Sequence, residues 1–205
     1  MKLRNDLYKY FIKSATEICY QASLESFFEH ANVLDVGIGN GIMLEKFHPL
    51  IKSKGLKITG IDINRVYLNH CCDLISKDGL KDHIEIYCRP VESFAPNPGL
   101  EFDYIFFSMS FMLLDDSEYV LDRVKEWLAP NGKIVFFQTM YKNSFPLMDF
   151  IKPKLKYFTT VEFGRVTYED EFFALLSRKG LRVIEDRLLS KEWFRGEYRL
   201  ISAAF

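Results

Sequence analysis

The stretch Val33–Gly41 reads VLDVGIGNG, and the rest of the chain is best interpreted around it. It begins as a short apolar run of β-prone residues that includes Asp35. It then breaks into three glycines at alternate positions, before an apolar-periodic segment resumes at Ile42. This order predicts a strand, a tight loop and the start of a helix. Because glycine has no side chain and reaches backbone conformations that other residues avoid, such a loop can lie directly against a ligand.

The spacing of the glycines separates two classes of ligand. A dinucleotide-binding loop carries a glycine three residues after its second glycine, where the helix N-terminus meets a pyrophosphate. In this chain that position is Ile42, and Asp35 lies two residues before the first glycine. A carboxylate there would repel a pyrophosphate but suits a cation, so the sequence disfavours a nicotinamide cofactor. The alternative is a glycine turn between a buried strand and a helix in some other α/β protein.

The pattern G-x-G-x-G, with an acidic residue two positions earlier, resembles motif I of the class I S-adenosylmethionine-dependent methyltransferases. The resemblance implies that Gly37, Gly39 and Gly41 approach the amino acid part of S-adenosyl-L-methionine. It also implies that Asp35 interacts with the ammonium group of this cofactor, through hydrogen bonds or through water. The methyl donor would then leave as S-adenosyl-L-homocysteine.

A second signal lies in the next predicted strand, Lys57–Ile63. Asp62 stands at its carboxyl end, roughly 20 residues past the glycines, where a carboxylate can accept hydrogen bonds from both ribose hydroxyls. The alternative is that Asp62 caps the following helix, a role that Asn64 could fill instead. Strand end, spacing and residue type together favour the ribose role, and we expect Ile63 to belong to the same cofactor site.

Two further strands supply the remaining candidates. The resemblance implies that Glu92, which follows the predicted strand Ile84–Cys88, accepts a hydrogen bond from the adenine amino group, with Val91 beside it. A solvated loop glutamate is the alternative. The aromatic-rich run Phe102–Ser108 predicts a buried central strand, and Ser108 at its exit is expected near the transferable methyl group. No obvious general base follows Ser108, which favours a nitrogen acceptor over an oxygen acceptor.

Strands and helices alternate along the chain, which predicts an α/β fold with a doubly wound, mostly parallel sheet flanked by helices. The resemblance implies seven strands in the order 3-2-1-4-5-7-6, with the last strand antiparallel. Leu128–Gly132 resembles the family's turn into the fifth strand, with Asn131 in a left-handed conformation. Pro49 is expected to interrupt the helix that starts at Ile42, and Thr167–Asp170 to open the last helix as a capping box.

Residues 1–30 are predicted to form an N-terminal helical lid, and residues 31–205 the methyltransferase domain. Because aromatic residues at helical spacing also build cores, the lid role has a plain structural alternative. A substrate-side insert is expected at about 141–167, since a connection this long inside a compact domain is usually functional.

The insert carries aromatic residues and a basic run at 152–156, which could bind an acceptor or form a solvated helical cap. Tyr8, Tyr141 and Asn143 are candidates for contacts with the acceptor, and no catalytic residue is assigned.

Composition limits the class of protein. Apolar residues make up 48% of the chain, charged residues 27%, and the net charge is −1, so we expect no nucleic-acid partner and no attraction to acidic membranes. No window approaches the roughly 20 apolar residues of a membrane span, which favours a cytoplasmic protein. The four cysteines and four histidines show no zinc-ligand spacing, so no metal is expected. A monomer or a homodimer is anticipated.

The first hypothesis is therefore a methyltransferase that acts on a small-molecule acceptor, favoured by the compact chain and its near-neutral charge. A protein methyltransferase with the lysine-bearing insert as its docking surface is the second. A noncatalytic nucleoside-binding protein with the same fold is the third.

Overall fold

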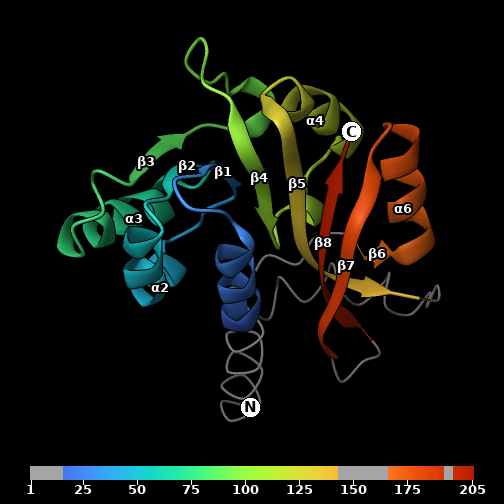
Figure 1. Cartoon of the computed structure of the whole chain (residues 1–205), viewed down its shortest axis with the longest axis horizontal. Helices are drawn as coiled ribbons and strands as arrows, with labels where there is room; N and C mark the ends of the chain where they lie inside the picture. The colour runs from blue at the N-terminus through green and yellow to red at the C-terminus, as the bar shows by residue number, and fades with distance from the viewer. Residues whose placement is uncertain (1–15, 143–165, 192–195) are drawn as a thin grey trace.

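The computed structural model describes residues 16–142, 166–191 and 196–205 (Figure 1). Residues 16–26 are helical and precede the first strand. The further elements are β1 (Asn32–Val36), α2 (Ile42–Ser53), β2 (Lys57–Asp62), α3 (Arg65–Lys77), β3 (Ile84–Cys88), η1 (Val91–Ser93), β4 (Phe102–Ser108), η2 (Phe111–Leu113), α4 (Ser117–Lys125), β5 (Leu128–Tyr141), β6 (Thr167–Tyr168), α6 (Glu169–Arg178), β7 (Arg182–Lys191) and β8 (Glu197–Ala204).

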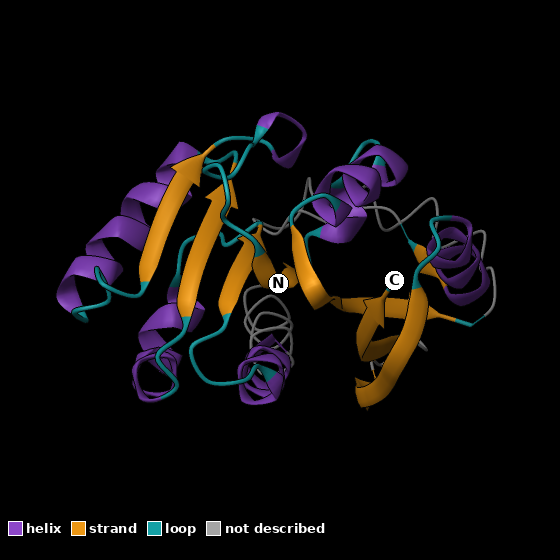
Figure 2. Ribbon diagram, turned by 45° about the horizontal axis from the view of Figure 1, so that its top comes forward, coloured by secondary structure: helices purple, strands orange, loops and turns teal. Residues whose placement is uncertain are grey.

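The strands form one sheet in the order β3-β2-β1-β4-β5-β8-β7, and the short β6 pairs separately with β5. Strands β1 to β5 run parallel to one another, whereas β8 runs antiparallel to its two neighbours, β5 and β7. Helices lie on both faces of the sheet (Figure 2). With β6 left out of the count, this is the predicted order with its antiparallel last strand, so the predicted fold class is confirmed.

The central strands are buried on both faces, which explains their nearly continuous apolar sequences. In β1, Val33 packs into a cluster that includes residues of helix 16–26 and α2, while Leu34 and Val36 pack into a cluster that includes residues of α4 and α6. Asp35 is the only charged residue among the four buried positions of β1, and its side chain is only 1% exposed. The strand that leads into the glycine loop therefore places a carboxylate in the core.

Helix 16–26 is part of the core. Cys19, Tyr20 and Leu24 are buried, and Phe27, just after the helix, is buried with them. All four belong to the cluster on the Val33 face of the sheet. The predicted lid also covers residues 1–15, which lie outside the described residues.

The expected interruption at Pro49 is wrong, since α2 runs from Ile42 to Ser53 with Pro49 inside it. A proline cannot donate to the carbonyl four residues earlier, which here is that of Glu45. The Nδ1 atom of His48 lies 2.8 Å from this carbonyl oxygen. The imidazole, in the tautomer protonated at Nδ1, therefore replaces the missing backbone donor.

The expected capping box at Thr167–Asp170 is also wrong. Thr167 and Tyr168 form β6, which pairs with Met140 and Tyr141 of β5, and α6 begins at Glu169 without a side-chain cap. Pairing with a distant strand thus outweighs the local capping signal.

The turn expected at Leu128–Gly132 lies within β5, as an irregularity in its register with β4. Asn131 has φ 68°, which confirms its predicted left-handed conformation. A Cβ atom at Gly132 would lie 2.9 Å from the carbonyl oxygen of Phe102, so the two strands approach closely at this glycine.

Candidate functional site

The candidate residues gather at the edge of the sheet where the parallel strands end. β1, β2, β3 and β4 end at Val36, Asp62, Cys88 and Ser108, and neighbouring parallel strands finish on the same edge. The order of strands reverses between β1 and β4. A crevice outside such a reversal is where ligands bind in open α/β sheets.

The three glycines of the loop all have positive φ values, 85°, 64° and 73°. A Cβ atom at Gly37 would lie 2.6 Å from Cβ of Ser110, and one at Gly41 would lie 2.8 Å from Sγ of Cys71. At Gly39 the nearest heavy atom would be 4.0 Å away. The outer two glycines therefore allow protein segments to pack closely, whereas the middle one leaves space for a ligand.

The loop is tied to the end of β2. The backbone N–H of Gly39 donates to Oδ2 of Asp62 at 2.9 Å, and the N–H of Asn64 donates to Oδ1 at 2.8 Å. Asn64 caps α3 by accepting from the N–H groups of Val66 and Tyr67, so the alternative in which Asp62 caps this helix is wrong. Each carboxylate oxygen has two lone pairs, and Asp62 can accept further hydrogen bonds.

Asp35 lies beneath the loop. The hydroxyl of Tyr20 donates to its Oδ2 at 3.1 Å, while Oδ1 is buried and has no hydrogen-bond partner among the described residues. Burial raises the pKa of Asp35 to about 7; the Tyr20 hydrogen bond opposes this shift, and the charge of Asp62 adds to it. An unpaired acceptor oxygen of this kind suits a cationic donor.

The other candidates for the nucleoside part lie around the ends of β2 and β3. Ile63 is 72% exposed, which makes it an apolar surface directly after Asp62. Val91 is buried and Glu92 is partly exposed, both on η1. An apolar side chain beside a carboxylate is suited to a nucleoside, which presents a flat ring and a polar sugar.

Ser108 ends β4, but Ser110 makes the contact with the glycine loop. The Oγ atom of Ser110 donates to the carbonyl oxygen of Val36, the last residue of β1, and its Cβ lies against Gly37. Sequence reasoning missed Ser110 and did not single out Tyr20. A small residue just beyond a strand exit is the signal that could have indicated Ser110.

Three features bear on the cofactor that the resemblance implies. An added Cβ at Gly39 would have no heavy atom nearer than 4.0 Å, Oδ1 of Asp35 is buried without a hydrogen-bond partner among the described residues, and the carboxylate of Asp62 keeps lone pairs for further donors. Asp35 lies in β1, Gly39 in the glycine loop and Asp62 at the end of β2, and all three lie at or next to the glycine loop.

Some predicted contacts lie beyond the structure. Tyr8, Asn143 and the basic run 152–156 fall outside the described residues, and Tyr141 is buried at the end of β5. Within the described ranges, no group of three or more His, Cys, Asp or Glu side chains could hold a metal ion. No helix in those same ranges is both long and apolar enough to cross a membrane.

Comparison with known proteins adds a family and relatives. Residues 12–186 match the family model described as a methyltransferase domain. A malonyl-(acyl-carrier protein) O-methyltransferase 2 of Ilyobacter polytropus is 26% identical over 155 residues, which are 72% of this chain and 57% of that relative. The chain thus spans little more than half of that curated relative.

Solved structures share the fold at low identity. A SAM-dependent methyltransferase from Aquifex aeolicus superimposes with a TM-score of 0.69 at 22% identity, covering 94% of this chain and 93% of its own. The cyclase SpnF superimposes with a TM-score of 0.74 at 14% identity, covering 91% and 79%. The same fold thus occurs in proteins named for different activities.

Proposed function

Because this chain belongs to the methyltransferase domain family, within the class I S-adenosylmethionine-dependent superfamily, we propose that it methylates a small-molecule acceptor. The observation that carries this proposal is the hydrogen bond from Gly39 to Asp62, which joins the open loop to the carboxylate expected at the ribose. S-adenosyl-L-methionine supplies an activated methyl group on a sulfonium ion.

The residues of this chain would act by binding and alignment. In the proposed site, Asp62 accepts from the ribose hydroxyls, Asp35 faces the ammonium group, and Gly39 lets the backbone approach the amino acid part. Glu92, with Val91 and Ile63 nearby, would meet the adenine ring. Transfer then requires a nucleophile held in line with the methyl–sulfur bond in a site that excludes water.

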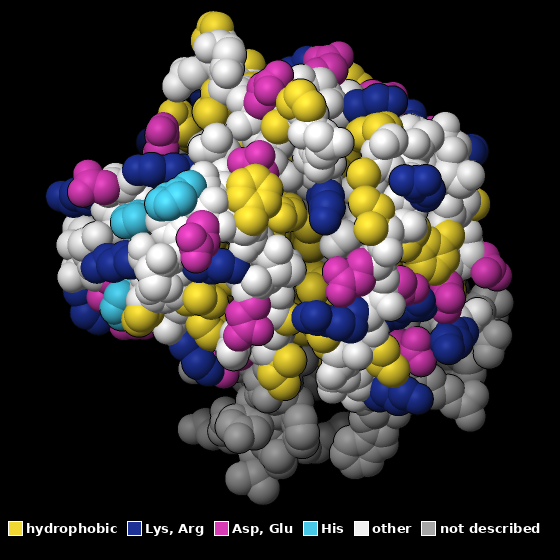
Figure 3. Space-filling view, in the orientation of Figure 1, with side chains coloured by type: hydrophobic (Ala, Val, Ile, Leu, Met, Phe, Trp, Pro, Cys, Tyr) yellow, Lys and Arg dark blue, Asp and Glu magenta, His cyan; other side chains and the backbone are white. Residues whose placement is uncertain are grey.

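Among the described residues no general base is assigned, and this disfavours an acceptor hydroxyl. A neutral amine nitrogen can attack without losing a proton first, and so can a carboxylate oxygen, whereas a hydroxyl usually needs a base. We favour nitrogen. The O-methyltransferase name of the curated relative supports an oxygen acceptor as the second candidate, delivered on a carrier protein. On the face shown in Figure 3, basic and acidic side chains are interspersed, without a single-sign docking patch.

A radiolabelled transfer assay tests the function. The protein is incubated with methyl-labelled S-adenosylmethionine and either a panel of small amines and carboxylic acids, acyl-carrier proteins, or cell protein. Label in a small molecule is expected. Label only in carrier-linked or other protein would replace the first candidate, and no transfer despite tight cofactor binding would favour a noncatalytic protein.

We further propose a cytoplasmic location and a monomer or homodimer.

The affinity for S-adenosylmethionine is expected to rise with pH through about 7, because the cation favours the ionised form of Asp35, whose pKa burial raises to about 7. Folding stability changes with pH in the opposite direction to cofactor affinity. Because the pKa of Asp35 is higher in the folded protein than in the unfolded chain, protonated Asp35 stabilises the fold fully below about pH 4, and this contribution is lost as the pH rises to 7. Calorimetric titrations with the cofactor from pH 6 to 9 measure the binding effect.

Tyr20→Phe should move that binding profile to higher pH, because it removes the hydrogen bond that lowers the pKa of Asp35. Tyr104→Phe is the matched control. The Tyr104 hydroxyl lies 3.5 Å from the carbonyl oxygen of Ser26, so this variant also loses a phenol hydroxyl beside helix 16–26 but leaves Asp35 untouched. Identical pH profiles for the two variants would contradict the role given to Tyr20.

A further inference from the structure

An exposed histidine on α3 contacts the glycine loop. The Nδ1 atom of His70 lies 2.8 Å from the backbone carbonyl oxygen of Asn40, which stands between Gly39 and Gly41. Because a carbonyl oxygen can only accept a hydrogen bond, Nδ1 carries the proton and donates it. His70 is not among the residues that α3 buries, so core packing gives it no role. Its bond joins the helix to the loop across 30 positions of sequence.

α3 is held in place independently of His70. The helix buries the side chains of Leu68, Cys71, Leu74 and Ile75. Asn64 caps its first turn, and near its other end Lys77 pairs with Glu45 of the neighbouring helix α2 at 2.9 Å (Figure 1). α3 is therefore a fixed support from which a side chain can hold the loop.

The backbone of the loop comes very close to α3 next to this bond. A Cβ atom at Gly41 would lie 3.1 Å from Cα of Cys71 and 2.8 Å from its Sγ. Cys71 is itself 0% exposed, so the contact is closely packed. Two consecutive residues of α3 thus contact two consecutive residues of the loop, one through packing and one through a hydrogen bond.

The polar groups of the loop are bonded in a consistent way. The N–H of Gly39 donates to Oδ2 of Asp62, and the carbonyl of the next residue, Asn40, accepts from the imidazole. The side-chain Oδ1 of Asn40 accepts from the N–H of Ile42 at 3.2 Å. The N–H groups of Asn40 and Gly41 donate to no backbone carbonyl among the described residues. The protein thus engages the acceptors of this turn and leaves donors for a ligand.

A fixed loop should bind the methyl donor more tightly than a loose one. Glycines have many accessible backbone conformations, and ordering them has a large entropic cost. A loop that already holds its bound conformation loses less entropy when the ligand arrives. Asn40 directly follows Gly39, the glycine with open space beside it. A donor that fixes the carbonyl of Asn40 therefore orders the loop where the ligand is expected.

We propose that His70 is a positioning residue for the methyl donor: by donating to the carbonyl oxygen of Asn40, it holds the glycine loop in the conformation that binds the donor, before the donor arrives. The proposal rests on the proposed cofactor site. His70 acts through Asn40 and touches neither the donor nor the reacting atoms. Loss of its bond weakens cofactor binding and loosens the loop in the free protein.

The test compares His70→Leu and His70→Asn with the wild type in calorimetric titrations with S-adenosylhomocysteine. Leucine and asparagine have equally many side-chain heavy atoms and both branch at Cγ, but only asparagine has an N–H on an atom bonded to Cγ, as Nδ1 of histidine is. His70→Leu should bind about fivefold more weakly than the wild type, and His70→Asn should stay within about twofold of it.

Hydrogen exchange in the free protein tests the positioning role directly. The amide of Gly39 donates to Asp62, and it exchanges when the loop opens. Its exchange should be roughly fivefold faster in His70→Leu and be restored in His70→Asn. If His70 acted only by touching the cofactor, exchange in the free protein would be the same in all three proteins, and that result would overturn the proposal.

His48→Leu is the matched control. The Nδ1 atom of His48 also lies 2.8 Å from a backbone carbonyl oxygen, that of Glu45, but the bond is internal to α2. This variant should unfold about 2–4 °C below the wild type and retain its cofactor affinity. His70→Leu should show the reverse, with weaker affinity and an unfolding temperature within about 2 °C, because leucine favours a helix more than histidine does.

Normal binding by the wild type with equal affinity in His70→Leu would overturn this inference and leave the proposed cofactor site intact. A loss of affinity that His70→Asn does not restore would also overturn it, since the donor would then not be the cause. If the wild type itself binds no S-adenosylhomocysteine, the proposed site fails, and the inference fails with it.

Discussion

Asp62→Ala is expected to weaken binding of S-adenosylmethionine by on the order of a hundredfold. A carboxylate that accepts from two ribose hydroxyls makes two charge-assisted hydrogen bonds, each of about 1.5 kcal/mol or more. The substitution also leaves the N–H of Gly39 without the acceptor that holds it at 2.9 Å, so the loop loses its tie to β2. Calorimetric titration with the cofactor measures the loss.

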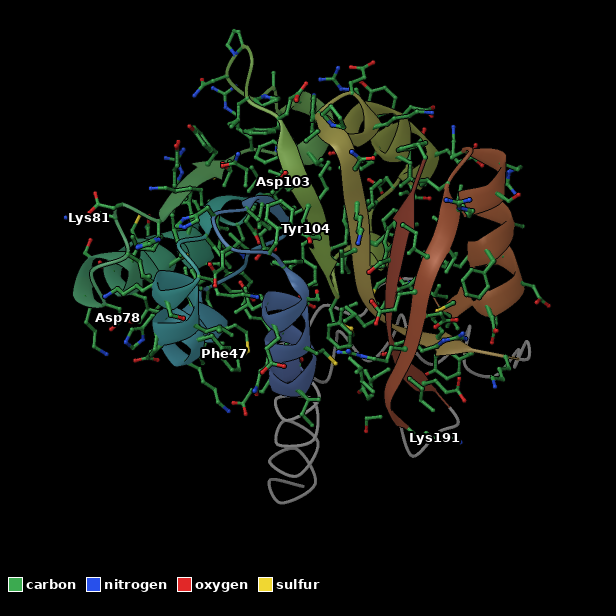
Figure 4. The ribbon with its side chains drawn as sticks, in the orientation of Figure 1. Phe47, Asp78, Lys81, Asp103, Tyr104 and Lys191 are labelled. Carbon is green, nitrogen blue, oxygen red and sulfur yellow. The ribbon has the colours of Figure 1, made fainter. Side chains whose placement is uncertain are left out.

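Asp103→Ala is the matched control for this experiment. Oδ2 of Asp103 accepts from the backbone N–H of Asn32 at 2.8 Å, so it too is a carboxylate that anchors a backbone amide. Asp103, labelled in Figure 4, is the second residue of β4, whereas the candidate site lies where the parallel strands end. This variant should lose folding stability yet retain cofactor affinity. Unchanged affinity in Asp62→Ala would remove the main support for the assigned site.

Gly39→Val is expected to reduce cofactor affinity by roughly tenfold to a hundredfold, since a side chain would fill space that the ligand needs. Overpacking of a fitted site typically costs about 1–3 kcal/mol. Nothing in the protein opposes the new side chain closely, because the nearest heavy atom to a Cβ there is 4.0 Å away. The loss should therefore appear in titrations with the cofactor far more than in the packing of the free protein.

Gly180→Val is the matched control for Gly39→Val, because it separates the effect of backbone strain from the effect of blocking the cofactor site. Gly180 has φ +74°, close to the +64° of Gly39, and it also has no heavy atom within 4 Å of an added Cβ. Both variants should lose about 1–2 kcal/mol of folding stability from the left-handed backbone. Only Gly39→Val should lose cofactor affinity. Equal affinity losses in the two variants would show that backbone strain, and not the open space, explains the effect.

Several features of the fold were predictable because they depend on short-range sequence. The strands β1 and β4 are buried and have largely apolar sequences, which identified both of them with small errors at their ends. Asn131 adopts the left-handed conformation expected of it, and Asn64 caps α3. In each case the residue's own chemistry favours the observed conformation.

The errors and omissions arise where distant segments meet. Pro49 is tolerated because the ring of His48 reaches the carbonyl that lacks a donor, and Thr167 forms a strand because β5 offers it a partner. The contact between Ser110 and the glycine loop joins residues 74 positions apart, as the hydrogen bond to Val36 records. The spacing of apolar residues along the chain does not predict contacts between such distant segments.

By itself, the sequence determined which segments form the central strands, the glycine loop and the position of the acid after the second strand, because apolar pattern and glycine spacing act locally. The order of the strands in the sheet was implied by the resemblance to a family. Only the tertiary structure decided which glycine faces open space and that Asp35 is held by Tyr20 with one oxygen unpaired. These properties depend on which side chains are brought together from separate segments. Burial then sets their pKa and their need for a partner.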